Sequence, residues 1–337
     1  MHWMPFHQPR VGVGISAERL TLAHVRPRRL WRQRPTVRAL RSEVLPAGLV
    51  TPSATELNVA DVPVLADHLS RLLGPHQSLG VSLTLPDRCG TLALYQIEAV
   101  PDQSQEMTAL LRWRMKQEDL PVSADAQLVY RVFPVPRGIG VHRQGSTAAS
   151  VLVCGLRPKI LAQYQEVCER ARVVPLSIGL HSLRVVDLCR PLLQSVREGF
   201  VVSVLARQVL LMAFCDGRPV FLRYTTLSAD PVDLTTSILS TIQFYDDTWR
   251  AELTERTGES PRPVVIVADH GGPTEVTSDA DAGSGPKRTD GSSPLTPQAR
   301  IQLMALTRDT PSLKLAWGAG VSVIEGAWGT IASVLAA

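Results

Sequence analysis

The chain has 337 residues, of which 45% are hydrophobic and 20% charged, and its formal net charge is +4. This composition is typical of a soluble globular protein, and the length allows two domains with their own cores. A net charge this small in a chain of this length does not indicate nucleic acid, and no nucleic-acid partner is predicted.

The five cysteines show no CxxC spacing, and most of them lie within apolar runs. Free cysteine in such a run behaves as a small hydrophobic residue, so neither a zinc site nor a disulfide framework is expected. The N-terminal residues contain no long apolar stretch, and no run of about 18 residues is both apolar and uncharged. The sequence therefore predicts a cytoplasmic protein that reaches a membrane only through a partner.

Positive charge is concentrated in one segment, residues 26–41. The arginines there are Arg26, Arg28, Arg29, Arg32, Arg34, Arg38 and Arg41. Three interpretations stay open: a solvated strand edge, as most charge runs are, a patch that faces anionic lipid or an acidic partner, or, as a third possibility, a surface for nucleic acid.

The first half of the chain alternates between strand and helix patterns. Two apolar runs from Val11 to Val25 predict a strand, a turn and a second strand, and residues 37–44 predict a third. Helical spacing predicts a helix over 61–73, ended by Gly74-Pro75. Further strands are expected at 81–85, 92–100, 128–133 and 149–156. Further helices are expected from about 104 to Pro121 and over 159–171 and 182–193, with a loop at 135–149 and a crossover at 173–175.

The second half opens on a second meander. Apolar runs at 200–205, 209–215 and 220–224 predict three strands, and Asp216-Gly217 predicts a hairpin turn between the last two. A helix over 233–248 and a strand over 264–268 follow. Residues 270–298 are rich in small polar residues and predict a disordered loop. A short helix at 301–306 and a final strand and helix complete the prediction.

Four segments carry a family resemblance, and they occur in the same order as in that family. They are VSLTLPD (81–87), YQIEAVP (95–101), the helix and strand from Met107 to Phe133, and KILAQYQEVCERARVVPLSI (159–178). Together they resemble the PilM family, the actin-like proteins of type IV pilus assembly, to which MshI and the cytoplasmic domain of GspL are related. A generic α/β protein of other descent is the alternative.

The resemblance implies an actin-like α/β fold of two lobes with a small α+β subdomain inserted in the first. Residues 1–78 and 175–198 are expected to form the first lobe, residues 79–174 the inserted subdomain, and residues 199–337 the second lobe. The implied partner is a bitopic, PilN-like inner-membrane protein whose cytoplasmic N-terminal peptide docks on the chain, and contacts with motor ATPases are also implied. We expect the docking surface near residues 81–85 and 107–115.

Where the family's nucleotide-binding members carry Asp-x-Gly, this chain departs from the pattern. In the first phosphate loop Gly14 stands at the Asp position and Ser16 at the Gly position, and in the second loop Ser203 and Leu205 stand there. An Asp would position the metal, and a Gly would let backbone N–H groups approach the phosphates. On the adenine side, Gly271 and Gly272 remain after Asp269-His270.

These departures predict a catalytically inert scaffold that uses no ATP or magnesium. The alternative is a nucleotide-dependent ATPase or switch with unusual loops. We predict no catalytic residue and no metal site. Asp246-Asp247 are interpreted as a solvated helix end, and Asp269-His270 are interpreted as the start of a polar loop.

Overall fold

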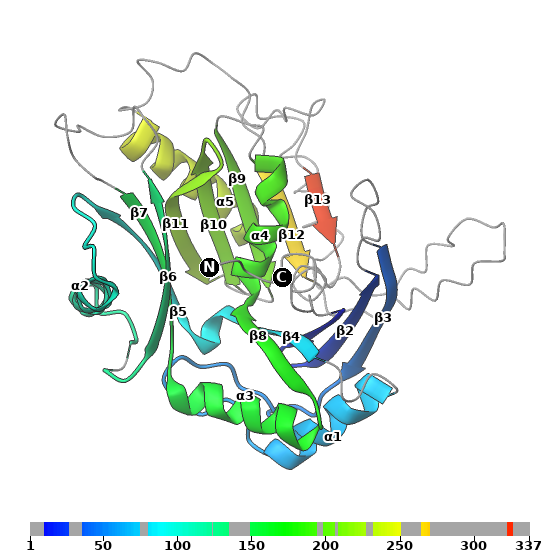
Figure 1. Ribbon diagram of the computed structural model, residues 1–337. Coiled ribbons are helices and arrows are strands. Elements are labelled where there is room, and N and C mark those ends of the chain that lie inside the picture. Colours follow the sequence, from blue (N-terminus) through cyan, green and yellow to red (C-terminus); the bar gives the residue numbers. More distant parts are fainter. Residues whose placement is uncertain are drawn as a thin grey trace.

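The structure of the chain is a computed structural model. It describes residues 10–26, 36–74, 80–122, 124–134, 149–193, 198–205, 208–226, 232–250, 264–269 and 322–325. Three β-sheets, each with its own helices, make up this part of the chain (Figure 1).

The first lobe is built on a five-stranded sheet in the order β3-β2-β1-β4-β8. Its strands are β1 (Val11–Ile15), β2 (Arg19–Arg26), β3 (Thr36–Val44), β4 (Gly80–Leu85) and β8 (Val174–Leu180). The first three pair antiparallel, and β1–β4 and β4–β8 pair parallel. Helices α1 (Val62–Leu73) and α3 (Pro158–Arg170) pack against each other and share a core with Val11, Leu83 and Tyr164.

The second lobe repeats this arrangement in the order β11-β10-β9-β12-β13. Its strands are β9 (Glu198–Leu205), β10 (Gln208–Cys215), β11 (Arg218–Thr226), β12 (Val264–Asp269) and β13 (Ser322–Glu325). Asp216 and Gly217, with φ of 50° and 71°, join β10 to β11, so the predicted hairpin turn is confirmed. Helix α5 (Val232–Tyr245) follows β11 and continues into a π-helical turn, η3 (Asp246–Arg250).

Between β4 and α3 the chain forms a separate three-stranded antiparallel sheet in the order β5-β7-β6. The strands are β5 (Thr91–Ile97), β6 (Gln127–Pro134) and β7 (Ala149–Leu156), and α2 (Ser104–Gln117) lies on the outer side of the sheet (Figure 1). Met107, Leu111 and Met115 of α2 are buried against Tyr95 and Val153.

The extent of this inserted sheet differs from the prediction at both ends. β4 and α3, which the sequence placed in the insert, belong to the first lobe: β4 pairs with β1, and α3 packs on α1. β8 is also a strand where a crossover was expected. Pro175 lies within β8, which is an edge strand, where a missing N–H is tolerated.

Helix α4 (His181–Leu193) connects the two lobes in the sequence and lies beside the second sheet (Figure 1). Its buried residues Val185, Val186 and Cys189 pack against Val201 and Met212 of the second lobe. Because its N-terminus follows β8 directly, the same helix is fixed to both lobes.

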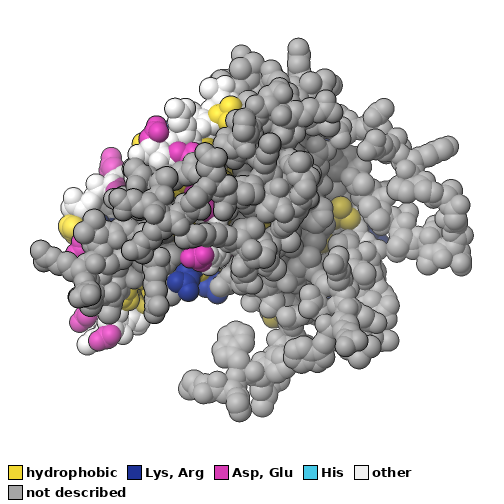
Figure 2. Space-filling model, turned by 90° about the horizontal axis from the view of Figure 1, so that it is seen from above, with side chains coloured by type: hydrophobic (Ala, Val, Ile, Leu, Met, Phe, Trp, Pro, Cys, Tyr) yellow, Lys and Arg dark blue, Asp and Glu magenta, His cyan; other side chains and the backbone are white. Residues whose placement is uncertain are grey.

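Several predictions lie outside the described residues. They are the loop at 135–148, the polar loop 270–298 with Gly271 and Gly272, the helix at 301–306 and the final helix. No helix in the described ranges is long and apolar enough to cross a membrane. On the face seen in Figure 2, the acidic and hydrophobic side chains of the described residues are scattered.

Candidate functional site: the lobe junction and its groove

The two predicted phosphate-loop regions occupy equivalent places, near the carboxyl ends of the middle strands β1 and β9. In the first, the Ser16 hydroxyl donates to the Arg19 carbonyl at 3.0 Å and accepts from the Arg19 N–H at 3.0 Å. The Thr21 hydroxyl donates to the Gly14 carbonyl at 3.4 Å. The polar groups of this turn therefore bond to one another.

In the second region, Ser203 pairs with Leu210 of β10 and with Val267 of β12. Its side chain is only 2% exposed, and its Oγ has no hydrogen-bond partner among the described residues. Leu205, the last residue of β9, places an apolar side chain where the resemblance calls for glycine. Neither region supplies a carboxylate at the metal-binding position.

Metal ligands are also lacking elsewhere in the described part of the chain. No three His, Cys, Asp or Glu side chains in these ranges lie together as a metal site. Asp246 and Asp247 fall in the π-helical turn η3, where Asp247 is exposed. Asp269 ends β12, as predicted, and His270 lies outside the described residues.

A buried carboxylate marks the point where both lobes and the insert meet. Asp87, in the short 3₁₀ helix η2 (Asp87–Cys89), is 5% exposed and accepts hydrogen bonds from the Ser182 N–H, at 2.9 Å, and from the Ser182 hydroxyl. Ser182 is the second residue of α4, so Asp87 caps this helix. Burial raises the pKa of Asp87 to about 6, although the Ser182 hydrogen bonds lower it.

Groups from all three parts surround this carboxylate. Burial, and then the charge of Asp87, raises the pKa of Cys154 in β7 to about 12 and that of Tyr224 in β11 well above its usual value. Burial also lowers the pKa of the neighbouring His181 to about 4. The cap thus lies where η2, the insert and the second lobe meet.

An apolar core extends across the same junction. Its members come from β5, β7, α4, β9, β10 and β11: Leu92, Leu152, Cys154, Leu183, Val185, Val186, Cys189, Val201, Leu210, Met212, Phe214, Leu222 and Tyr224. A hydrogen bond of 3.3 Å from the Gln96 amide to the Val220 carbonyl joins the insert to the second lobe at its edge. This core therefore joins α4 and the insert to the second lobe. The first lobe has its own core around α1 and α3, and the partly buried Cys154 and Leu183 pack against both cores.

A groove of about 230 Å³ lies beside this core. One wall is the face of the inserted sheet opposite α2, with Val129, Arg131 and Phe133 of β6, and the other includes Val186 and Asp187 of α4. Val129 is 72% exposed, and the Arg131 guanidinium lies 5.3 Å from the centre of the Phe133 ring. The lining is mainly apolar, with one cation and one anion.

The sequence placed docking elsewhere in the insert, near 81–85 and 107–115. The structure buries Val81, Leu83 and Leu85 completely, and it buries Met107 and Met115 beneath α2. The groove residues were missed because Leu128 to Phe133 is apolar at nearly every position, so its alternation does not reveal which face is open.

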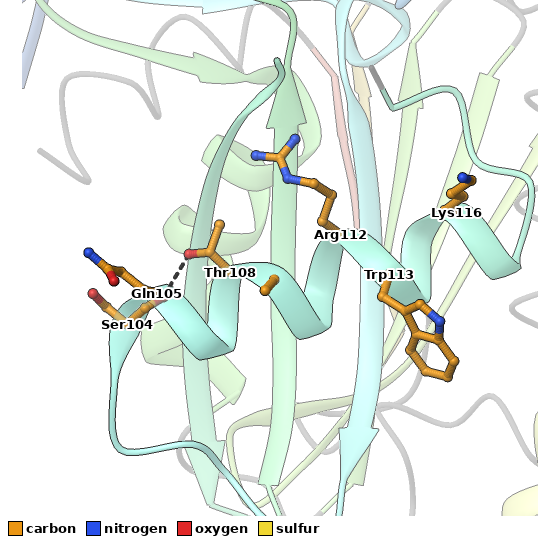
Figure 3. Close-up of a pocket in the computed structure, with 7 residues that line it drawn as sticks. Ser104, Gln105, Thr108, Arg112, Trp113 and Lys116 are labelled. Atoms are coloured by element: carbon orange, nitrogen blue, oxygen red, sulfur yellow. Dashed lines mark hydrogen bonds between the residues drawn. The ribbon is translucent and has the colours of Figure 1, made fainter. Parts of the chain in front are cut away.

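A second hollow, of about 570 Å³, runs along the outer face of α2 (Figure 3). Its described lining comes from this one helix: Ser104, Gln105, Thr108, Ala109, Arg112, Trp113 and Lys116. Arg112 is bound to the carbonyl groups of Ala124 and Ala126, at 2.5 and 3.0 Å. Although larger, this hollow is open, and the groove beside α4 is the better-formed site.

One solved structure has a fold similar to that of this chain. Over 98% of its length, and 98% of the other chain, the protein matches a chain of the "PilM-PilN type IV pilus biogenesis complex", with a TM-score of 0.60 and 19% identity. Together with the repeated sheet order, this match confirms the predicted actin-like fold of two lobes. At this identity the likeness concerns the fold alone.

More distant structures match with TM-scores too low to add to the argument. One is a Bacteroides thetaiotaomicron protein with an actin-like ATPase fold (TM-score 0.43, 10% identity, 78% of this chain and 82% of that chain). Another is the cytoplasmic domain of EpsL from the type II secretion system of Vibrio cholerae (0.41, 10%, 77% and 81%). No protein-family model and no curated protein matches the chain.

The buried Asp87 predicts a specific pH dependence of stability. Its pKa in the folded chain, about 6, exceeds the ordinary value of 3.8, so the folded state holds this proton more tightly than the unfolded chain. The stabilisation is complete below pH 3.8 and is lost as the pH rises through about 6. We expect Asp87→Asn, which stays neutral, to gain about 2–3 kcal/mol relative to the original chain between pH 4 and 7.

Urea unfolding of both proteins across this pH range measures the difference. His181 has the opposite dependence, because its folded pKa is lowered, but it is present in both proteins and cancels. A difference that stays constant from pH 4 to 7 would show that the Asp87 carboxyl titrates normally.

Proposed function

We propose that this chain is a cytoplasmic, actin-like scaffold of a type IV pilus or type II secretion assembly machine. In this role it docks the cytoplasmic N-terminal peptide of a bitopic, PilN-like inner-membrane protein. The observation that carries the proposal is the groove between the inserted sheet and α4, on a chain whose fold matches a PilM-PilN complex chain over 98% of both lengths. Contact with the membrane is then indirect, and motor ATPases are further candidate partners.

The groove suits a short peptide in size and chemistry. Its apolar lining, from Val129, Phe133 and Val186, would bury side chains of an extended segment, and Arg131 and Asp187 would orient it. Because α4 and the inserted sheet both form the walls, a bound peptide contacts the element that joins the lobes.

The proposal includes an inert nucleotide site. Gly14 and Ser203 provide no carboxylate for a metal, and Leu205 fills a position where backbone must approach phosphate. The hydroxyl of Ser16 is already bonded within its turn.

Calorimetric titration with ATP and magnesium tests this part. We expect no heat up to millimolar nucleotide, because no described side chain at either loop can hold the metal. Micromolar binding would instead favour the alternative, a nucleotide-dependent switch in the same assembly.

Peptide docking is tested with the cytoplasmic N-terminal peptide of a bitopic, PilN-like membrane protein from the same organism. We expect Val129→Glu to weaken binding at least about tenfold, since it places a charge in the apolar groove. Val44→Glu is the matched control, because Val44 is a similarly exposed valine, at 61% against 72%, on an edge strand of the first lobe. Equal affinities for the two variants would place docking outside the groove, and no binding to the original chain would refute the proposed partner.

A further inference from the structure

The edges of the three sheets differ in how they are protected against pairing with another strand. An edge strand presents unpaired N–H and C=O groups, and proteins protect such edges with prolines, bulges, charged side chains, short length or a covering element. In the described part of the chain the edge strands are β3, β8, β11, β13, β5 and β6.

Five of these edge strands have a proline, a register shift, a short length or a covering element. β8 contains Pro175, and its pairing with β4 shifts register at the same place. β3 and β11 are each paired through a register shift, and β13 has four residues. β5 lies against β11, where the Gln96 amide donates to the Val220 carbonyl.

Of the features that protect an edge strand, β6 has only a charged side chain, that of Arg131. It pairs with β7 from Gln127 to Pro134 without a register shift, and its single proline is its last residue. Within the described ranges β7 is its only paired strand. Val129, the third residue of β6, has the largest exposed fraction, 72%, among the exposed large hydrophobic residues of the described part. Such an edge is an aggregation hazard unless a partner strand uses it.

We propose that the free edge of β6 is a strand-addition site, at which the partner's peptide binds in an extended conformation as a fourth strand beside β6. This inference rests on the proposed function, because it states how the docked peptide is held. Backbone hydrogen bonds would supply much of the affinity, and alternate side chains would supply the specificity.

The side chains of β6 define the chemistry of this partner. Leu128 and Tyr130 pack against the α2 core, and Val129, Arg131 and Phe133, at the alternate positions, line the groove, to which Tyr130 also contributes. Residues opposite these three in an added strand contact them directly. The complementary peptide therefore has an acidic residue flanked, two positions away on each side, by apolar residues. Because Arg131 lies at the centre, this pattern holds for parallel and antiparallel addition.

The first experiment measures binding of the partner's N-terminal peptide to the full chain, with single N-methyl groups placed along the peptide backbone. In an added strand every second amide donates to β6, so methylation in one phase should weaken binding at least tenfold and methylation in the other should be tolerated. Equal effects in both phases would overturn strand addition while leaving docking in place. A peptide that does not bind even when unmodified would overturn the proposed function, and this inference with it.

A charge swap tests the assignment of Arg131. Arg131 is exposed, so Arg131→Glu should fold normally and lose at least tenfold in affinity for the original peptide. A peptide with Lys in place of its central acidic residue should recover that affinity. Failure of the swapped peptide to recover it would contradict the assigned pairing. A dimer of the chain alone, formed with rising concentration and abolished by Val129→Pro, would show that a second copy, and not the peptide, occupies this edge.

Discussion

The arrangement of this protein depends on one buried contact, the cap that Asp87 places on the first turn of α4. The carboxylate lies in η2, two residues after the end of β4, and it accepts hydrogen bonds from the N–H and the hydroxyl of Ser182. From this point α4 passes into the second lobe, where Val185 and Cys189 are buried. The position of the lobes relative to each other therefore follows from where this helix begins.

The apolar core around α4 stabilises the attachment of this helix to the second lobe. Burying one side chain of the size of valine or phenylalanine stabilises a protein by about 1.5–3 kcal/mol. Eight buried residues take part in this core, together with partly buried neighbours from the insert, α4 and β11. Separating α4 from the second lobe would expose Val185, Val186 and Cys189 to water and would therefore be costly.

The packing at this junction is consistent with the proposed loss of nucleotide binding. An actin-like switch needs a ligand that bridges the lobes and changes their angle. Here Gly14 and Ser203 stand where the resemblance places the metal-binding Asp, and an apolar core packs α4, which begins at the Asp87 cap, onto the second lobe. The proposed scaffold is consistent with both observations, since a docking platform benefits from a groove whose walls do not move apart.

Much of the fold could be predicted from local pattern. Alternating apolar runs located the two meanders, and Asp216-Gly217 located a turn whose positive φ angles only a few residue types adopt easily. The boundaries of the insert were harder to predict from the sequence, because they depend on strand pairing between distant residues. β4 pairs with β1 across some 70 residues of sequence. The start of β8 differs from the prediction, because the sequence placed a crossover at residues 173–175, whereas β8 begins at Val174 and includes Pro175, which an edge strand tolerates.

The site was less accessible to sequence reasoning. The phosphate-loop positions Gly14, Ser16, Ser203 and Leu205 lie on the predicted strands and turn, yet whether they bind nucleotide stays a prediction. The groove was not foreseen, because β6 is apolar on both faces and only the packing of α2 and α4 decides which face is open. The Leu-Pro-Asp segment contained the signal for Asp87, but its partner Ser182 lies 95 residues away.

The central claim is that the apolar junction, and not nucleotide, sets the angle between the lobes. Spin labels on Glu56→Cys and Gln243→Cys, exposed positions in the first and second lobes, measure this directly, since the native cysteines are buried or half-buried. We predict one narrow distance distribution that is unchanged by millimolar ATP with magnesium. A shifted or second population on adding nucleotide would contradict the claim and would show that the lobes still respond to a phosphate ligand.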